Sequence, residues 1–366
     1  MHVLRVANFV SPTSGGIKTA LQAWGENYQA QGHRASLIIP GPGPEITEEA
    51  QGMVFRVPAT PIPGKGYSLM WSRAGMAQLM EAIAPDALEV SDRSTTRWMG
   101  RWARRRGIGS VMISHENMTG IMVRRTPVPD GPAVWAADLI NRRSAHDYDA
   151  IVTPSQFSAQ EFFRLGVDAV VVPLGVDLET FAPVRDPQAH RPPAPDELIR
   201  LVHCGRLSPE KRPQQSIETV RELARRGLNV QLTVFGDGPL RDELLRRAQN
   251  LPVVFHSYIT DRAELASKMG EADVAIAPGP LETFGLAALE VLACGVPTVC
   301  SDEGALFEVV GDGGYIAHSD AEYVDGVLEL LRRPDARVRA RAQAEKFSWH
   351  TSATRMLAVH ESLRRR

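Results

Sequence analysis

The protein has 366 residues, which is too long for one ordinary domain and about right for two. Apolar residues make up 43% of the chain, an ordinary share for a globular protein, so each half can bury a sizeable core. The formal net charge of −2 argues against a general nucleic-acid binder, because phosphate contacts need a basic face.

The first half of the chain alternates strand-like and helix-like runs. Residues 3–10 are predicted to form a buried strand, 17–32 a helix that ends at a glycine, and 35–41 a second strand. A strand–helix–strand unit of this kind predicts a parallel sheet. Further strand-like runs continue the pattern at 86–92, 109–116, 150–155 and 169–177.

A change of composition separates the halves. Residues 181–197 are rich in proline and polar residues, as a linker would be. After them strands and helices alternate again, at 199–205, 214–227, 230–238, 240–251, 253–259, 262–272, 273–279 and 297–302. We therefore expect an α/β protein with two doubly wound parallel-sheet domains. Ligands of such sheets bind at the carboxyl ends of strands, so the domains are expected to face a common cleft.

Cysteine usage and hydrophobic runs bear on the compartment. The three cysteines lie in apolar surroundings without a CxxC spacing, which favours reduced thiols and a cytoplasmic protein: Cys204, Cys294 and Cys300. The start, MHVLRVANFVSP, is broken too early to be a signal peptide, and no run approaches the ~18 apolar residues of a membrane span. We expect a soluble protein that could still touch a membrane surface.

Two glycines lie between the first predicted strand and helix. Gly15 and Gly16 follow Ser14, where backbone N–H groups can approach an anion at a helix N-terminus, although a plain tight turn is an equal interpretation. The loop is not GxGxxG, and the second strand ends in Pro40-Gly41 without an acid to hold a ribose. A nicotinamide dehydrogenase is therefore disfavoured.

Two cations follow the first strand of the second half. The run HCGRLSPEKRP at 203–213 offers Arg206 and Lys211 from one loop, and two fixed cations at a strand end suit a diphosphate. The alternative is a solvated loop with incidental charge. The turn VFGDGPL at 234–240 is either a plain turn or a second place where backbone approaches a ligand.

The stretch GPLETFGLAALEVLACG carries two glutamates eight positions apart. We expect a helix that starts near Phe284 and stops at Gly295, so Glu282 lies just before its positive end, where a carboxylate can accept from sugar hydroxyls. Glu290 lies two turns on, ~10 Å away by the helical rise, which suits a ribose diol. The alternatives are a capping acid for Glu282 and a buried ion pair for Glu290.

Polar residues also end strands in the first half. His115 follows VMIS and Asp92 ends DALEVSD, so each is either structural or faces the cleft and orients a hydroxyl.

The run at 95–107, TTRWMGRWARRRG, places apolar residues on one side of a predicted helix, with arginines around them. Core packing with a solvated basic face is favoured there over a basic aromatic helix at an anionic membrane. The apolar residues are Trp98, Met99 and Trp102, and the arginines are Arg97, Arg101, Arg104 and Arg105.

Together these motifs resemble the retaining glycosyltransferases of the GT-B fold over nearly the whole chain. The resemblance runs from the Gly-Gly loop through TPSQFSAQEFFRLGV, VPLGVDLETF, GRLSPEK and GDGPLRDEL to the E-x7-E element ETFGLAALE and LACGVPTV. The ending FSWHTSATRML resembles the family's last helix, which crosses back to the first domain. The resemblance implies an acceptor-binding domain at 1–180 with a returning helix at 347–366, a linker at 181–197 and a nucleotide-sugar-binding domain at 198–346.

The resemblance also implies residue roles. Gly15 and Gly16 approach the donor diphosphate, which Arg206 and Lys211 clamp. The donor sugar is held by Glu282 and by the backbone of Phe284, Gly285 and Leu286.

The remaining implied contacts concern the ribose, the base and the acceptor. Glu290 binds the ribose, and His115 lies beside the sugar and the acceptor. Tyr258 and Ile259 end a strand where the family holds the base, and Asp261 could accept from a guanine edge. Where the family often has an Asn before Gly-Val-Asp, this chain has a leucine, so we assign that loop no catalytic role.

A narrower resemblance concerns substrates. VANFVSPTSGGIKTAL, DALEVSDRSTTR, VMISHE and APGPLETFGLAALEVLACG are most similar to phosphatidylinositol mannosyltransferase-like enzymes. This implies transfer of mannose from GDP-mannose to a lipid-linked, inositol-containing or small polyol acceptor, with peripheral contact at the inner face of the plasma membrane. The alternatives are a UDP-glucose or UDP-N-acetylglucosamine donor, a sugar-nucleotide epimerase and a non-catalytic nucleotide-sugar sensor.

The predicted mechanism needs no metal. No His, Cys or DxD cluster suggests a metal site, so Arg206, Lys211 and a helix end must neutralise the leaving group. No carboxylate is obviously placed as a nucleophile. We therefore expect retention by same-face attack, with the departing phosphate accepting the acceptor's proton.

Overall fold

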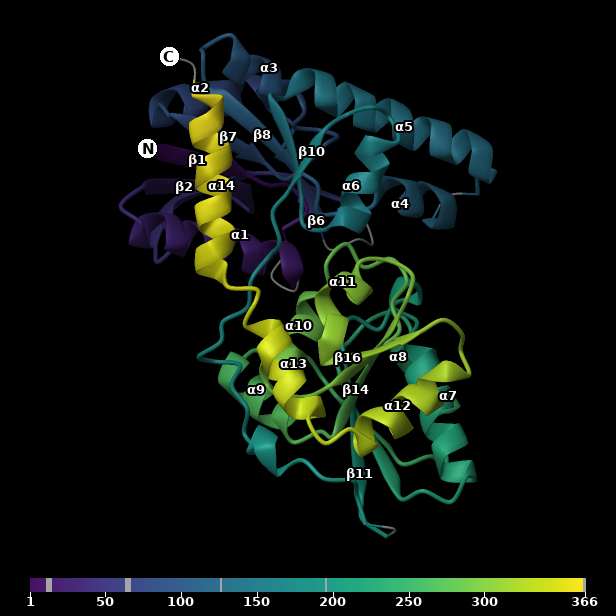
Figure 1. Ribbon diagram of the computed structural model, residues 1–366. Helices are drawn as coiled ribbons and strands as arrows, with labels where there is room; N and C mark the ends of the chain where they lie inside the picture. The colour runs from purple at the N-terminus through teal and green to yellow at the C-terminus, as the bar shows by residue number, and fades with distance from the viewer. Residues whose placement is uncertain (11–14, 63–66, 126, 195, 365–366) are drawn as a thin grey trace. The chain divides into compact units, whose positions relative to one another are not determined.

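The computed structural model describes residues 1–10, 15–62, 67–125, 127–194 and 196–364. The chain divides into two compact units. Unit 1 comprises Met1–Gly175 together with Trp349–Arg366, and unit 2 comprises Val176–Ser348 (Figure 1). None of the helices in the described ranges is both long and apolar enough to cross a membrane.

Unit 1 is built on an eight-stranded sheet of order β10-β9-β8-β7-β1-β2-β4-β3. All neighbours are parallel except β3 and β4. The central strand, β1, is buried throughout because β2 and β7 pair with both of its edges and helices cover the sheet. The strands are β1 His2–Val6, β2 Arg34–Gly41, β3 Glu45–Glu49, β4 Gly52–Pro58, β7 Ala87–Val90, β8 Gly109–Ile113, β9 Ala150–Thr153 and β10 Ala169–Val171, with a separate hairpin of β5 Thr60–Ile62 and β6 Tyr67–Leu69.

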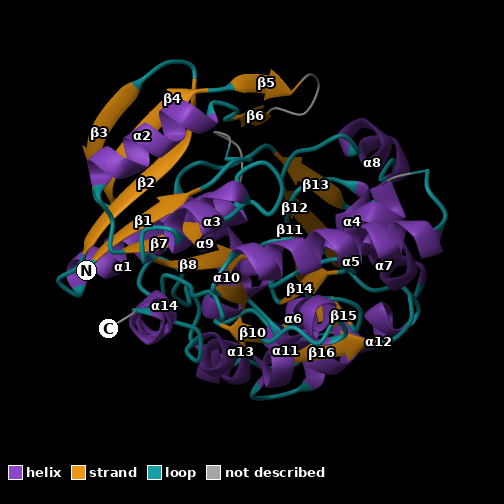
Figure 2. Ribbon diagram, turned by 90° about the horizontal axis from the view of Figure 1, so that it is seen from above, coloured by secondary structure: helices purple, strands orange, loops and turns teal. Residues whose placement is uncertain are grey.

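Helices cover this sheet, and helices α1, α2 and α3 lie beside its strands in Figure 2. Their apolar sides join the sheet in a core that includes Leu4, Met80 and Trp102. The helices of unit 1 are α1 Gly16–Ala30, α2 Arg73–Ile83, α3 Trp98–Arg104, α4 Met118–Arg125, α5 Asp130–Asp147, α6 Gln156–Phe163 and α14 Trp349–Leu363.

The last helix, α14, packs against α1 through aromatic and polar contacts (Figure 1). The indole of Trp24 meets Trp349 edge to face at 6.5 Å and donates to Ser352 Oγ at 2.9 Å. Deeper in unit 1, Nε2 of His360 lies 2.7 Å from Oε1 of Glu89. The C-terminal helix is thus part of the unit 1 core.

The carboxylate of Glu89 also connects other elements of unit 1. It accepts a hydrogen bond of 2.6 Å from Tyr28 Oη, and the fully buried guanidinium of Arg5 is stabilised by its charge. The side chains of Arg5, Tyr28, Glu89 and His360 are all at most 1% exposed. We call these four residues the Glu89 network.

Unit 2 is built on a six-stranded parallel sheet of order β13-β12-β11-β14-β15-β16. The strands are β11 Ile199–Cys204, β12 Val230–Phe235, β13 Val253–His256, β14 Val274–Ala277, β15 Thr298–Ser301 and β16 Gly314–Ala317. The helices are α7 Pro213–Arg225, α8 Arg241–Arg247, α9 Arg262–Gly270, α10 Leu286–Ala293, α11 Leu306–Val310, α12 Glu322–Arg332 and α13 Ala336–Ala344, with short 3-10 turns η1 Pro187–Ala189, η2 Pro209–Lys211 and η3 Gly311–Gly313.

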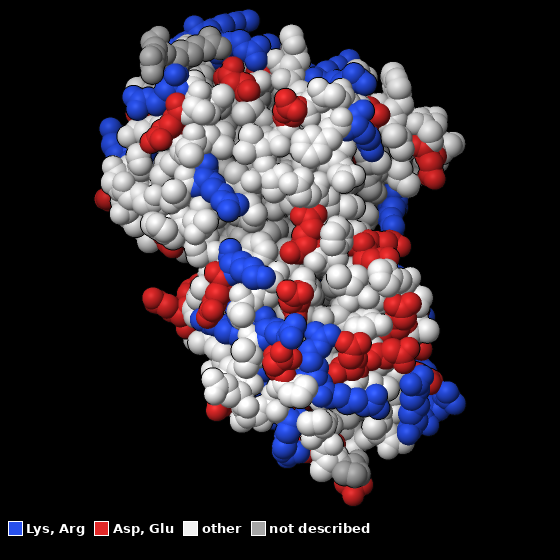
Figure 3. All heavy atoms as spheres, in the orientation of Figure 1, with Lys and Arg blue, Asp and Glu red and all other residues white. Residues whose placement is uncertain are grey.

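Helices α7 and α12 show why unit 2 folds this way. Each has apolar residues at helical spacing that enter one core with the strands, such as Ile217 and Val220 in α7 and Val327 in α12. Their outer faces carry ion pairs, such as Arg221 with Glu218 at 3.0 Å. On the face of unit 2 seen in Figure 3, basic and acidic side chains accordingly lie next to one another.

The expected linker behaves differently from a free connection. The chain enters unit 2 at Val176, and the segment 181–197 is part of that unit. Phe181 is only 1% exposed, and its carbonyl accepts from Arg341 at 2.8 Å. Arg185 pairs with Asp273 at 2.6 Å. A buried aromatic residue and these polar contacts hold the proline-rich segment to unit 2.

Candidate active site

The cations predicted to bind a diphosphate lie at the carboxyl end of the unit 2 sheet. Arg206 comes two residues after β11, and Lys211 ends the 3-10 turn η2. Glu282 lies in the loop after β14, the strand that neighbours β11. Because parallel neighbours end at the same sheet edge, these loops meet where α/β sheets bind ligands.

An ion pair joins the two loops. Nζ of Lys211 contacts Oε1 of Glu282, and the side chains are 29% and 20% exposed. The Glu282 carbonyl accepts from the backbone N–H of Ala305 at 2.8 Å, which fixes the loop to the chain that follows β15. A cation and a carboxylate are therefore held together at the sheet edge, both within reach of solvent.

The loop that carries Arg206 rests directly on the glycine-rich turn after β12. Leu207 donates its N–H to Asp237 O at 2.9 Å. A Cβ on Gly236 would collide with the carbonyl oxygen of Gly205, and a Cβ on Gly238 would collide with the carbonyl of Leu207. The glycines of this turn are thus explained by close backbone packing.

The side chain of Arg206 is exposed, and none of the described residues pairs with it. Its neighbour in the chain, Leu207, is fully buried and anchors the loop. The guanidinium is therefore free to meet an anion from solvent while its backbone is fixed.

Helix α10 begins two residues later than predicted, at Leu286, with Gly285 as its N-cap. The N-cap, Gly285, has no side chain that could cap the helix, and the carboxylate of Glu282 contacts Lys211, so the capping role considered for Glu282 is not observed. Phe284 is 3% exposed and packs edge to face on Phe347 at 5.7 Å, which anchors the turn before the helix. The first N–H groups of α10 remain available to a ligand.

Glu290 is buried in α10, with 7% of its surface exposed. Its Oε1 contacts Nη2 of Arg262, the first residue of α9. Burial raises the pKa of Glu290, and the charge and hydrogen bond of Arg262 oppose that rise. The ion-pair alternative considered for Glu290 is therefore observed, and its ribose-binding role stays a prediction. Arg262 is a residue that the sequence patterns did not single out.

The segment predicted to hold the base follows a shorter strand than expected. β13 ends at His256, so the prediction that Tyr258 and Ile259 end a strand is wrong; they lie in the following loop, with Tyr258 53% exposed. Asp261 caps helix α9 by accepting from the N–H groups of Ala263 and Glu264, at 2.8 and 3.2 Å. One oxygen of this predicted guanine acceptor is thus already occupied.

The candidate residues of unit 1 lie at the carboxyl ends of its strands. Gly15 is the N-cap of α1 and Gly16 its first residue, both exposed, while Ser14 lies outside the described residues. His115 follows β8, and its Nε2 lies 3.0 Å from Ser91 Oγ. Burial and the nearby positive charge of an arginine lower the pKa of His115 to about 4, so the ring is neutral near pH 7.

Asp92 lies two residues after the end of β7 and is held by its own loop and by Asn8. Its carboxylate accepts from Asn8 Nδ2 at 3.0 Å, from Ser94 N at 2.7 Å and from the hydroxyl of Thr95. Burial opposes ionisation, but these hydrogen bonds outweigh it and lower the pKa of Asp92. A structural role accounts for its contacts.

The basic aromatic run at 95–107 also packs as a structural element. Met99 and Trp102 belong to the unit 1 core, at 1% and 6% exposure. Arg97 and Arg101 both pair with the buried Asp147 at 2.9 Å. These contacts favour the core-packing interpretation over a membrane-binding helix.

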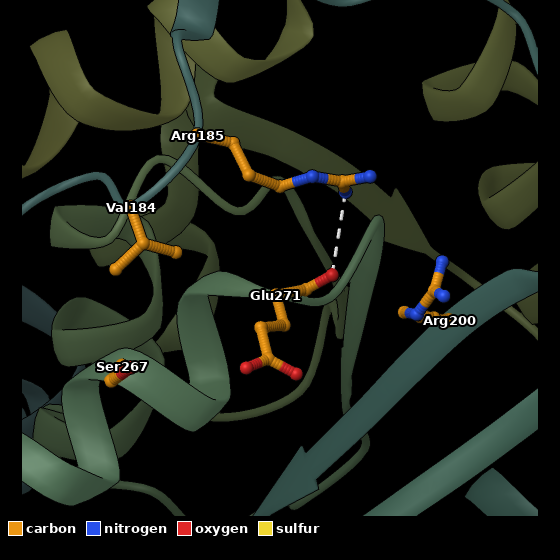
Figure 4. Close-up of a pocket in the computed structure, with 5 residues that line it drawn as sticks. All are labelled: Val184, Arg185, Arg200, Ser267 and Glu271. Carbon is orange, nitrogen blue, oxygen red and sulfur yellow. Dashed lines mark hydrogen bonds between the residues drawn. The ribbon is translucent and has the colours of Figure 1, made fainter.

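A cavity of about 420 Å³ lies elsewhere in unit 2 (Figure 4). Arg200, in its wall, is the second residue of β11, so the cavity is at the amino end of the sheet, opposite Arg206 and Lys211. Arg185 donates to the backbone carbonyl of Glu271 across it. In the part of the chain that the structure describes, no group of three or more His, Cys, Asp or Glu residues could hold a metal ion.

We expect His203, a buried histidine in β11 just before the loop that carries Arg206 and Lys211, to make unit 2 less stable in acid. Nδ1 of His203 lies 2.9 Å from Ser216 Oγ, and burial lowers its pKa to about 4. Below pH ~6.5 the unfolded chain binds a proton that the folded protein does not. The free energy of unfolding therefore decreases as the pH is lowered, by about 1.4 kcal/mol per pH unit, until pH ~4. His203→Gln should reduce this slope by that amount in unfolding followed by circular dichroism.

The control for this prediction is an exposed histidine of the same unit. His318 pairs with Asp302 at 2.9 Å, and this hydrogen bond raises its pKa, so its effect has the opposite sign. His318→Gln should leave the acid slope in place. An unchanged slope in His203→Gln would refute the prediction.

Each unit is an α/β domain built on a largely parallel sheet. The carboxyl edge of the unit 2 sheet carries Arg206 and the Lys211–Glu282 ion pair in the loops after β11 and β14. This is the architecture and the kind of site of a GT-B glycosyltransferase. Family models match both units: "Glycosyl transferase 4-like domain" covers residues 15–175, and "Glycosyl transferases group 1" covers residues 184–347. The chain belongs to the group 1 glycosyltransferases, and the prediction of this family is confirmed.

Curated relatives agree with this assignment. The chain is 43% identical to the GDP-mannose-dependent alpha-(1-6)-phosphatidylinositol dimannoside mannosyltransferase of Mycobacterium tuberculosis (strain ATCC 25177 / H37Ra), over 98% of this chain and 96% of that protein. It is 30% identical to the D-inositol 3-phosphate glycosyltransferase of Kineococcus radiotolerans, over 68% of this chain and 66% of that protein.

Solved structures confirm the predicted fold. Sucrose-phosphate synthase from Thermosynechococcus elongatus superposes with a TM-score of 0.79 at 20% identity, covering 99% of this chain and 98% of that one. Anabaena HepE in complex with UDP and glucose gives 0.74 at 16% identity, covering 98% and 99%. At these identities the likeness concerns the fold alone.

Proposed function

We propose that this glycosyltransferase transfers mannose from GDP-mannose to a hydroxyl of a lipid-linked, inositol-containing acceptor, with retention of the anomeric configuration. The observation that carries the proposal is the Lys211–Glu282 ion pair at the carboxyl edge of the unit 2 sheet, with the exposed Arg206 on the same loop as Lys211 and helix α10 starting shortly after Glu282. The choice of mannose and of an inositol lipid is supported by the 43% identical relative, a GDP-mannose-dependent phosphatidylinositol dimannoside mannosyltransferase.

On this proposal the donor diphosphate replaces the carboxylate that Lys211 holds in the structure. Arg206 and Lys211 stabilise the negative charge that builds up as the bond from the anomeric carbon to the diphosphate breaks. Glu282, released from Lys211, accepts hydrogen bonds from the sugar hydroxyls. The acceptor oxygen bonds to the anomeric carbon on the same face, and its proton passes to the departing phosphate.

The unit 1 residues are assigned to the acceptor and the phosphates. His115 is neutral near pH 7, so its proposed task is to orient a hydroxyl by hydrogen bonding rather than to act as a cationic acid. Gly15 and Gly16, at the start of α1, offer backbone N–H groups to an anion. We propose that no metal takes part, since these groups can neutralise the leaving group.

A lipid acceptor would require the enzyme to work at a membrane surface. Peripheral contact is therefore part of the proposal, but the run at 95–107 does not support it, because Arg97 and Arg101 are both engaged by Asp147.

The first test is thermal stabilisation by GDP, UDP, GDP-mannose, UDP-glucose and UDP-N-acetylglucosamine without added metal. A ligand that binds only the folded protein at 100 times its Kd stabilises it by about 2.7 kcal/mol, so a selective donor raises the melting temperature. We expect the GDP compounds to give the largest rise, after which phosphoinositide acceptors are assayed. A larger rise with UDP compounds would disprove the mannose assignment while leaving the glycosyltransferase family in place.

A further inference from the structure

The two residues of the Glu290–Arg262 ion pair differ in exposure, and the pair uses one of the two carboxylate oxygens. The Glu290 side chain is 9% exposed, whereas that of Arg262 is 41% exposed. Arg262 engages Oε1 alone, and no described residue engages Oε2 of Glu290. A nearly buried carboxylate therefore has one oxygen fixed by a cation and one oxygen left for a ligand.

The position of Arg262 is not explained by the stability of its own helix. It is the first residue of α9, where the helix dipole disfavours a cation. The guanidinium instead lies 4.7 Å from the ring centroid of Phe181, a buried residue on the segment that enters unit 2. Asp261 caps the same turn. Capping and stacking thus hold the guanidinium against Glu290.

Charges around Glu290 make Arg262 its main electrostatic partner. Burial raises the pKa of Glu290, and Arg262 is the group that opposes this rise. The thiols of Cys204 and Cys294 also sense the carboxylate, but burial raises each of their pKa values to about 12, so both stay neutral between pH 6 and 8. Asp177, which interacts with Arg262, has a lowered pKa because hydrogen bonds within its turn outweigh burial, and it stays charged.

We propose that Arg262 is a positioning residue for the donor ribose: it fixes Oε1 of Glu290, so that Oε2 accepts from the vicinal diol. This inference rests on the proposed function, since its ligand is a nucleotide-sugar. Arg262 is the group among the described residues whose charge and hydrogen bond oppose the effect of burial on the pKa of Glu290, and its removal lets that pKa rise. The carboxyl then takes up a proton as the pH falls and becomes a poorer acceptor, so recognition of the diol becomes dependent on pH.

The test compares a nucleotide with its 2′-deoxy form by titration calorimetry at pH values from about 6 to 8.5. The nucleotide is GDP, or UDP if the wild type binds UDP instead. A hydrogen bond to a charged group contributes about 1.5–3 kcal/mol, so the wild type should prefer the ribonucleotide by about tenfold or more at every pH. Arg262→Gln should lose most of this preference, and more of it at pH 6 than at pH 8.5. Arg262→Lys should restore part of it.

Two further variants complete the design. Glu290→Gln should lose the preference at all pH values. Lys268→Gln removes a cation from the exposed face of the same helix, where Lys268 lies 3.8 Å from Glu264, and should behave as the wild type does. Melting temperatures show whether each variant is folded. If Arg262→Gln does not fold, Arg262→Lys, which keeps the positive charge, still tests the inference.

The outcomes separate the two proposals. Equal, pH-independent weakening of both nucleotide forms in Arg262→Gln would mean that the residue is merely structural, and would overturn the inference while leaving donor binding intact. A wild type that binds neither nucleotide would overturn the proposed function, and the inference with it.

Discussion

Replacing Arg206 or Lys211 with alanine is expected to lower turnover by about 10²–10³-fold each, because each removes a fixed donor of positive charge from the leaving diphosphate. Arg206→Ala is the cleaner variant: the side chain is exposed and no described residue pairs with it, so folding should be unaffected. Lys211→Ala also leaves Glu282 unpaired and is therefore accompanied by a melting curve. The measurement is transfer from GDP-mannose under saturating donor.

The matched control is another arginine of unit 2 on an exposed helix face. Arg221 pairs with Glu218 on α7, with 47% of its side chain exposed, so Arg221→Ala should retain wild-type turnover. Near-normal rates in both Arg206→Ala and Lys211→Ala would show that these cations do not carry the chemistry.

Glu89→Ala should destabilise unit 1 by about 3–5 kcal/mol, the usual effect of leaving a buried charge uncompensated, here that of Arg5. The change leaves the hydroxyl of Tyr28 and the ring of His360 without their shared acceptor and removes the charge that stabilises Arg5. Glu89→Gln keeps an acceptor at the same place and should lose less. Unfolding by denaturant gives the free energies.

Tryptophan fluorescence makes this measurement specific to unit 1. All six tryptophans of the chain lie in unit 1: Trp24, Trp71, Trp98, Trp102, Trp135 and Trp349. The control is Glu81→Ala, which removes a half-exposed carboxylate that pairs with Arg106, and should cost at most about 1 kcal/mol. Similar losses in Glu81→Ala and Glu89→Ala would mean that the Glu89 network adds no stability beyond that of an exposed pair.

The elements that were predicted from the sequence are those in which large apolar residues recur with a clear period. The central strands and helices α1, α7 and α9 lie within a few residues of their predicted bounds. Helices α2, α4, α6, α11 and α12 were not predicted, and α12 was overlooked despite a clear apolar face. Helices α5 and α13 were missed as well, and their buried sides carry small or polar residues, such as Ala137 and Asn141 in α5 and Ala340 in α13. These stripes pack closely but lack the hydrophobic contrast that a period search detects.

The candidate site was predictable as a set of chemical types, but its pairing was not. Lys211 and Glu282 are 71 residues apart, and they meet because β14 lies next to β11 in the sheet. This strand order cannot be read from the sequence. Arg262 and Glu290 meet through the packing of α9 on α10. The ligand roles of all these residues stay predictions until donor binding is measured.

The return of α14 to unit 1 affects the order in which the protein can fold during synthesis. Unit 2 is one continuous stretch, so it can fold as soon as Ser348 has left the ribosome. Unit 1 is encoded first but completed last, since His360 must emerge before Glu89 gains that partner and Trp24 can pack on Trp349. The usual order, in which the N-terminal domain folds first, is thereby reversed. A chain that stops before α14 would have a folded unit 2 and a unit 1 that lacks its last helix.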